Sequence, residues 1–304
     1  MNYLLSSYVC LSLAALSANA VTNSDTGAAS PVIPPGTSMA VVASEGLSLK
    51  APAAAPAKET LAIAHGLLDE LAAFTNAEQF VQARDKGLSA LETAAASDPL
   101  RGALEETLGR VTMALIRTPR MMPEKDAWVV KPGDSVARIA TAHGTTVELI
   151  LESNQIARPN LIKAGDRLRV LKAPLTLTVS KSRNDLLLKL DGRFCKRYRV
   201  GTGKFGRTPT GVFTISEKVR DPPWSRPDGK QVPFGEKENI LGTRWMSLKA
   251  VPPTEEVGGY GIHGTWDDAT LGKSESSGCV RLKNADVEEL FTILPYGARV
   301  VIEE

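Results

Sequence analysis

Short β-prone stretches separated by turn residues occupy the carboxyl-terminal half of the chain. The stretches cover residues 176–179, 186–190, 194–200, 212–215 and 299–302. Asn-Asp, Asp-Gly and Gly-Lys pairs separate the first of them, and residues 286–294 have the pattern of a helix. Many short strands without long helices between them are typical of an antiparallel sandwich or a barrel-like fold. We therefore expect residues 174–304 to form a mainly-β domain that resembles a β-sandwich.

Three segments of different composition come before this domain. Residues 1–20 hold a short apolar stretch and then Ala18-Asn19-Ala20, a small-x-small cleavage pattern, which indicates a secretory signal peptide and no membrane span after cleavage. Residues 21–58 are rich in Ala, Pro, Ser and Thr and cannot bury enough apolar surface to fold, so we expect a disordered linker. In 59–117, leucines recur mostly at three- and four-residue steps, which predicts about three helices in a small bundle of unknown role.

One imidazole and one thiol stand near each other in a chain that has only 3 His and 3 Cys. Cys279 follows His263 by sixteen positions, a separation that suits two adjacent strands and their connection. A cysteine attacks carbonyl groups as its thiolate, and a histidine can activate it by holding a thiolate-imidazolium pair. Gly278 allows a sharp turn that aims backbone N–H groups at a developing oxyanion. These residues predict a cysteine nucleophile with its base.

Four blocks of sequence occur together around this pair. They are Thr208-Pro209-Thr210-Gly211, Asn239 to Met246, Gly261-Ile262-His263-Gly264-Thr265, and Ser276-Ser277-Gly278-Cys279-Val280-Arg281. In this order they resemble the L,D-transpeptidase (YkuD-type) catalytic domain. The resemblance implies Cys279 as nucleophile, His263 as general base and acid, and Gly264 as the carbonyl that orients His263. It further implies the Gly278 N–H as an oxyanion donor, Arg281 as the group that holds a substrate carboxylate, and Ser276, Ser277 and Tyr260 as substrate contacts.

The resemblance implies an exported peptidoglycan L,D-transpeptidase. Such an enzyme attacks a tetrapeptide stem, releases D-alanine and passes the acyl group to an amine, either on another stem or on a lipoprotein lysine. With water as the acceptor it would be an L,D-carboxypeptidase. Ser277 stands where the family usually has histidine. This favours a rival from another class, a wall-binding protein with an inert catalytic-like domain.

A second resemblance covers residues 127–171. A strand and turn (128–136), two short helices (139–146 and 147–154) and a returning strand (162–170) follow one another. Asp134 or Ser135 is suited to cap the first helix and Gly144 to end it. The order resembles a LysM module, a β-α-α-β unit whose family binds N-acetylglucosamine-containing glycans. The resemblance implies glycan contacts at Gly133, Asp134, Ser135, Asn154 and Ile156.

The cysteines, the histidines and the net charge indicate which disulfides, cofactors, partners and compartment to expect. After signal cleavage only Cys195 and Cys279 remain, and a disulfide between them is the alternative to catalysis in an exported protein. Cys195 lies in a predicted strand, so we expect it to be free or buried. The histidines and cysteines form no ligand cluster, so no metal or other cofactor is expected. The net charge of +2, without a basic run among aromatic residues, indicates no nucleic-acid partner. We expect a multidomain α+β protein of the periplasm or cell envelope, associated with peptidoglycan.

Overall fold

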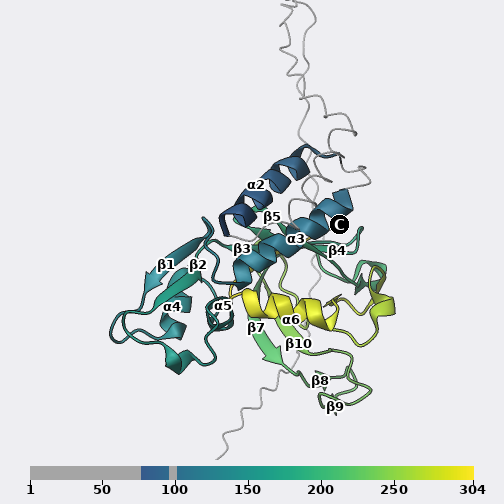
Figure 1. The fold of residues 1–304 in the computed structure, drawn as a ribbon. Coiled ribbons are helices and arrows are strands. Elements are labelled where there is room, and N and C mark those ends of the chain that lie inside the picture. The colour runs from purple at the N-terminus through teal and green to yellow at the C-terminus, as the bar shows by residue number, and fades with distance from the viewer. Residues whose placement is uncertain (1–76, 96–100) are drawn as a thin grey trace, which may run out of the picture. The chain divides into compact units, whose positions relative to one another are not determined.

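The computed structural model describes residues 77–95 and 101–304, and all of them belong to one compact unit that spans Pro52–Glu304 (Figure 1). The predicted signal peptide, the linker and the first predicted helix lie outside the described residues. Within the described part of the chain, no helix is both long enough and apolar enough to cross a membrane.

Two helices begin the described part, α2 (Ala77–Thr93) and α3 (Arg101–Arg117), and they lie side by side (Figure 1). Their facing side chains form a small buried cluster of Leu88, Ala90, Leu91, Leu104 and Leu108. The carboxyl-terminal half of α3 then continues into the core of the β-domain and packs on strand β5 (Arg193–Arg199). The apolar stripes were predicted correctly. The bundle of about three helices stays a prediction, since its first helix lies outside the described residues, and the two described helices also cover a strand of the neighbouring domain.

Residues 125–171 form a β-α-α-β unit, as the sequence predicted. Strand β1 (Lys125–Val129) pairs antiparallel with β2 (Arg167–Leu171), and α4 (Val136–His143), α5 (Val147–Ser153) and the short helix η1 (Pro159–Leu161) lie between them in the chain. Ser135 caps α4 by accepting a hydrogen bond from the Arg138 N–H, and Gly144 ends the helix at a φ of 62°. Both predicted cap positions are therefore confirmed.

The carboxyl-terminal domain is built on one sheet of eight strands in the order β13-β11-β10-β7-β14-β3-β4-β5. The strands not yet located are β3 (Leu175–Ser180), β4 (Asp185–Leu190), β7 (Gly211–Arg220), β10 (Arg244–Ala250), β11 (Gly261–His263), β13 (Val280–Arg281) and β14 (Arg299–Glu303). Two pairs of neighbours, β14 with β3 and β11 with β13, are parallel. The prediction of a sandwich or barrel-like domain is thus confirmed for its many short strands, and the described residues arrange eight of them in one sheet that contains two parallel pairs.

Smaller elements complete this domain. Strands β6 (Thr202–Gly203) and β12 (Ser274–Ser276) form one parallel pair, and β8 (Trp224–Ser225) and β9 (Gln231–Val232) form an antiparallel pair. Two short 3-10 helices, η2 (Lys204–Gly206) and η3 (Asp268–Thr270), lie in loops.

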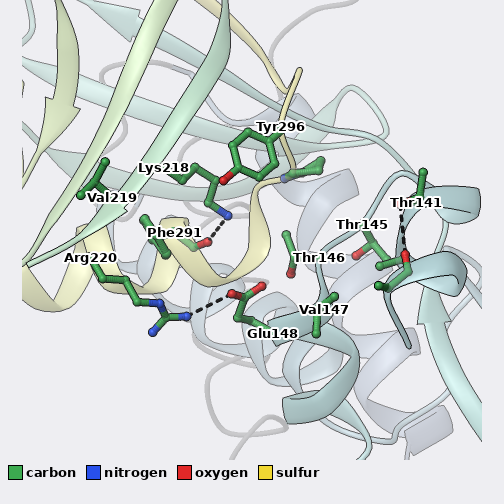
Figure 2. A pocket seen from close by; sticks show the side chains of 13 residues that line it. Thr141, Thr145, Thr146, Val147, Glu148, Lys218, Val219, Arg220, Phe291 and Tyr296 are labelled. Atoms are coloured by element: carbon green, nitrogen blue, oxygen red, sulfur yellow. Dashed lines mark hydrogen bonds and ion pairs between the residues drawn. The ribbon is translucent and has the colours of Figure 1, made fainter. Parts of the chain in front are cut away.

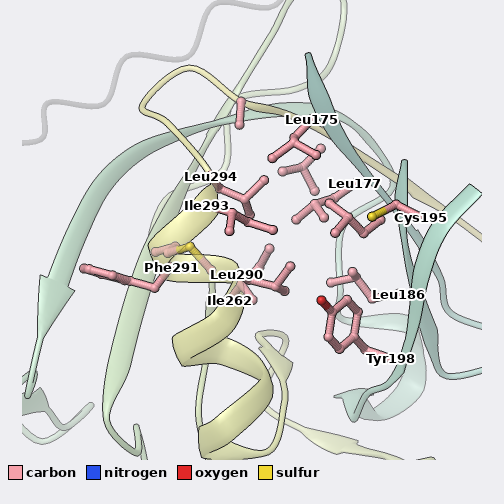
Figure 3. Close-up of a cluster of buried hydrophobic side chains, with 14 of the residues drawn as sticks. Leu175, Leu177, Leu186, Cys195, Tyr198, Ile262, Leu290, Phe291, Ile293 and Leu294 are labelled. Atoms are coloured by element: carbon pink, nitrogen blue, oxygen red, sulfur yellow. The ribbon is translucent and has the colours of Figure 1, made fainter. Parts of the chain in front are cut away.

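Helix α6 (Asn284–Ile293) fills the inner side of the sheet. Figure 3 shows Leu290, Ile293 and Leu294 turned toward strand residues that include Leu177. Cys195 lies in this core, fully buried and without a disulfide, and its thiol donates a hydrogen bond to the sulfur of Met113 at 4.0 Å. Cys279 is also free, so the disulfide alternative is excluded for this pair. The packed core supports the sheet edge at which β11 and β13 meet.

Candidate active site

Strands β11 and β13 bring the predicted base and nucleophile to one place. Their parallel pairing sets Ile262 opposite Val280 and His263 opposite Arg281. The side chains of Ile262 and Val280 are buried in the hydrophobic core. Because side chains alternate between the two faces of a strand, those of His263, Cys279 and Arg281 face away from this core. These last three residues line one cleft with a volume of about 640 Å³. The spacing predicted that His263 and Cys279 come together, and both line this cleft.

His263 is held in one orientation by its neighbours. Its Nδ1 lies 2.6 Å from the Gly264 carbonyl oxygen, and since a carbonyl can only accept, Nδ1 carries the proton and Nε2 is left as an acceptor. The indole of Trp245 stacks on the imidazole with the ring centroids 5.7 Å apart. Gly264 has no room for a side chain, because an added Cβ would lie 2.1 Å from Asn284 Oδ1. The predicted orienting carbonyl is thus in hydrogen-bonding position.

Burial shifts the pKa values of both His263 and Cys279. It lowers the pKa of His263 to about 4, an effect that the hydrogen bond to Gly264 only partly offsets. Burial also raises the pKa of the Cys279 thiol, against a smaller opposing effect of the Gly261 backbone and of Arg281. The thiol points to the Gly259 carbonyl oxygen, with 3.7 Å between sulfur and oxygen. Both shifts favour a neutral thiol and a neutral imidazole in the free site, and the ion pair expected from the sequence stays a prediction.

The turn before the nucleophile is fixed by a serine. Ser276 Oγ donates to the Cys279 carbonyl oxygen at 2.7 Å and accepts from the Gly278 N–H at 3.0 Å. Gly278 has a φ of 141°, and a Cβ there would lie 2.3 Å from the ring of Tyr260. The Gly278 N–H, predicted to be an oxyanion donor, is therefore already engaged within the turn. The Ser276 hydroxyl likewise serves the turn, so neither group is left for the substrate role that the sequence suggested.

Thr208 supports the same turn from the other side and was not singled out from the sequence. Its Oγ1 donates to the Gly278 carbonyl oxygen and accepts from the Gly203 N–H, both at 2.7 Å. The side chain is 1% exposed. The signal was present, since Thr208 belongs to one of the four sequence blocks, but its partners became visible only in the fold.

Arg281 has one unsatisfied donor. Its backbone is bridged to Gly201, with N–H to O distances of 2.8 and 2.9 Å in the two directions. Its Nε is buried, with no hydrogen-bond partner among the described residues. Ser277 is exposed and lines the cleft, whereas the predicted contact Tyr260 is absent from the cleft lining and packs behind Gly278. Of the predicted substrate contacts, Arg281, Ser277 and Ser276 line the cleft, and the Ser276 hydroxyl is already bonded within the turn.

The opposite wall of the cleft is a loop around β8, and Asn239 holds it. The buried Asn239 side chain donates to the carbonyl oxygens of Pro222, Val232 and Pro233 at 2.9 to 3.2 Å and accepts from the Leu241 N–H. Residues on both sides of this clamp, Trp224 and Leu241 among them, line the cleft. Sequence reasoning placed Asn239 in a family block but assigned it no role.

Comparison with known proteins decides the family. The Bacillus subtilis protein YkuD, which is assigned to the L,D-transpeptidases, is 34% identical to this chain over 180 residues, or 57% of this chain and 96% of that protein. This chain belongs to the L,D-transpeptidase family. Its residues 174–302 match the model of the L,D-transpeptidase catalytic domain, and residues 129–171 match the LysM domain. Both resemblances drawn from the sequence are confirmed.

Two further proteins are similar to this chain. The Bacillus subtilis protein YqjB, assigned in the same way, is 36% identical over 127 residues, which cover 41% of this chain and 69% of that protein. A crystal structure of an L,D-transpeptidase from Mycobacterium tuberculosis covers 46% of this chain and 70% of its own, at 16% identity and a TM-score of 0.36. The structural likeness carries no part of the assignment, which rests on sequence.

Most of the residues predicted to contact glycan make hydrogen bonds or packing contacts within the LysM unit itself. Asp134 accepts from the Trp128 indole N–H and the Lys131 N–H, and Ser135 caps α4. Asn154 bonds both backbone groups of Arg169 in β2, and Ile156 packs on the unit's core. The Gly133 carbonyl accepts from the Arg138 guanidinium. These residues shape the two turns, and their contact with glycan stays a prediction.

The two matched domains imply peptidoglycan binding and a cell-wall association. Among residues 77–95 and 101–304, no group of three or more His, Cys, Asp and Glu side chains is arranged to hold a metal ion.

Proposed function

We propose that this protein is an exported peptidoglycan L,D-transpeptidase in which Cys279 forms a thioester with a tetrapeptide stem and passes the acyl group to an amine. The observation that carries the proposal is the shared cleft of Cys279, His263 and Arg281, together with the Gly264 contact that leaves His263 Nε2 as the acceptor. A nucleophile, a base held by a third group and an anion-binding cation are what acyl transfer to and from a peptide requires.

Donor binding is assigned to Arg281. A buried guanidinium N–H without a partner is costly, and a carboxylate of the stem satisfies it with a charge-assisted hydrogen bond. The bridge between Arg281 and Gly201 fixes the backbone beneath this side chain. A bound stem is thereby placed beside the sulfur on the same face of the strand.

The acylation step follows from the protonation state of the free site. The neutral Cys279 thiol transfers its proton to His263 Nε2 as sulfur attacks the stem carbonyl. The oxyanion is assigned to the Cys279 N–H, because the Gly278 N–H donates to Ser276. His263, once protonated, gives its proton to the departing amine of D-alanine.

The second step returns the enzyme to its starting state. The amine of an acceptor attacks the thioester carbonyl, His263 takes a proton from this amine, and the sulfur leaves and is reprotonated. The product holds a new amide bond. An acceptor from a neighbouring stem gives a crosslink, a lipoprotein lysine gives anchoring, and water gives a shortened stem.

The test is the release of D-alanine from purified tetrapeptide muropeptides, with mass spectrometry of the products. The wild type is expected to release D-alanine and to form dimers, and Cys279→Ala is expected to do neither. Cys195→Ala, which removes the buried thiol, serves as the matched control and should retain activity. Release that survives in Cys279→Ala, or a folded wild type without any turnover, would contradict the proposal. The second result would favour the wall-binding alternative.

A further inference from the structure

A second cavity, of about 620 Å³, lies between the LysM unit and the catalytic domain (Figure 2). The end of α4 and the beginning of α5 form one wall, which includes Thr145 and Glu148. Strand β7 and the turn before β14 form the other, with Lys218, Arg220 and Tyr296. The cavity is distinct from the turns at 133–135 and 154–156 where the LysM resemblance implies glycan contacts.

The charged groups of this cavity are already paired within the protein. Lys218 Nζ donates to the carbonyl oxygens of Phe291 and Leu294, both at 2.7 Å, at the end of α6. Arg220 donates to Glu148 at 3.1 Å, as Figure 2 shows. A strongly charged ligand would have to displace these contacts, so the lining favours an uncharged one.

Two side chains of the cavity, those of Thr145 and Tyr296, have a hydroxyl without a partner and an exposed ring, respectively. The Thr145 side chain is 8% exposed, and its Oγ1 has no hydrogen-bond partner among the described residues. In Figure 2 this oxygen turns toward the middle of the cavity. Tyr296 is 66% exposed, and its ring is open to the cavity beside the Lys218 ammonium, which lies 5.8 Å from the ring centroid. The unpaired hydroxyl of Thr145 favours a ligand with polar groups, and the exposed ring of Tyr296 favours one with apolar faces.

We propose that this cavity is a saccharide-binding subsite that holds a sugar of the peptidoglycan glycan strand, with its ring on Tyr296 and one of its polar substituents on Thr145. A sugar ring is uncharged, has apolar faces and carries hydroxyl and amide groups at its edge, which is the combination that the lining leaves unmatched. The inference rests on the peptidoglycan partner of the proposed function but not on the chemistry of Cys279.

Strand β7 borders both this subsite and the cleft of Cys279. Along β7, Lys218 and Arg220 line this cavity, while Glu217 on the same strand lines the cleft of Cys279. A glycan strand held here is in contact with the LysM unit and with a strand of the catalytic cleft at once. The stems that it carries are thereby kept near the nucleophile.

The experiment measures binding of a β-1,4-linked N-acetylglucosamine hexamer to the full chain by calorimetry, in a Cys279→Ala background so that no turnover can occur. Tyr296→Ala and Thr145→Val are each expected to raise the Kd by about three- to tenfold. Thr145→Val keeps the shape of the side chain and removes only the hydroxyl, so its melting midpoint should not fall. Phe205→Ala, at a position 94% exposed elsewhere on the domain, is the matched control and should leave the Kd unchanged.

The outcomes separate this proposal from its alternatives. A lower melting midpoint with an unchanged Kd in both variants shows a purely structural role and overturns the proposal. The same measurement with a sugar-free tetrapeptide stem is expected to show no effect of Tyr296→Ala. If that variant weakens binding of the stem and not of the hexamer, the cavity is a peptide site and the proposal fails. Loss of D-alanine release is measured separately on Cys279-containing protein, so failure of the catalytic proposal does not alter these outcomes.

Discussion

Replacement of Thr208 by valine tests how the nucleophile turn is held. Valine has nearly the same shape, so the change removes one hydroxyl and leaves the Gly203 N–H and the Gly278 carbonyl oxygen without their 2.7 Å partner. Thr208 is 1% exposed, and each buried group left unsatisfied costs about 1–2 kcal/mol. The sum is about 2–4 kcal/mol, which for a domain of this size lowers the melting midpoint by roughly 5–10 °C.

The same replacement should slow catalysis, because the Gly278 carbonyl precedes the nucleophile directly. A displacement of the sulfur by a fraction of an ångström is expected to reduce the kcat of D-alanine release by roughly tenfold or more. Thr210→Val, two residues away at an exposed position, is the matched control and should change neither quantity. Calorimetric unfolding and the release assay give the two readings. A Thr208→Val protein that melts and turns over like the control would refute the account of this turn.

Two other predictions concern the cleft. Asn239→Ala removes the amide that holds the loop around β8, so we expect a higher KM for the stem and faster proteolysis of residues 222–233, and an unchanged KM would count against the clamp. The pKa of His263 is lowered from 6.5 to about 4 by burial, so the unfolded chain gains a proton first as the pH falls. The stability that neutral His263 contributes is present above pH 6.5 and is lost as the pH falls from 6.5 toward 4, by about 3 kcal/mol at most. His263→Gln should flatten this part of the unfolding profile, and parallel profiles of the two proteins would contradict the assigned burial effect.

The sequence predicted local structure well where local rules apply. The cap at Ser135 and the helix end at Gly144 were found from residue type alone, because a hydroxyl acceptor and a left-handed glycine act within one turn of the chain. The apolar stripes of α2 and α3 were found from their period. Strand β5, which lies more than seventy residues later in the chain, covers the apolar stripe of α3. The sequence of the helix itself does not predict this partner.

The sheet shows the same limit. Strand β14 at the end of the chain enters between β7 and β3, parallel to β3, so its neighbours are far away in sequence. Alternation predicts that a segment is a strand but not which strand it joins. For this reason the sequence predicted the strands of a mainly-β domain but not their order in the sheet.

At the site, the sequence identified the residues but not their hydrogen-bond partners. His263 and Cys279 were found from their types and spacing, and the Gly264 carbonyl from the family resemblance. The Gly278 N–H, expected from the sequence to donate to an oxyanion, donates in the structure to the hydroxyl of Ser276, two residues earlier. A serine in a turn has several backbone groups within reach, and the fold decides which of them it bonds.

The most direct measurement of the central claim is the intact mass of the protein after incubation with a carbapenem β-lactam. If Cys279 is the nucleophile of this cleft, its sulfur opens the lactam ring and the protein gains the mass of one carbapenem molecule. The adduct should persist in Cys195→Ala and disappear in Cys279→Ala. An adduct that remains in Cys279→Ala, or none in a folded wild-type protein, would contradict the account.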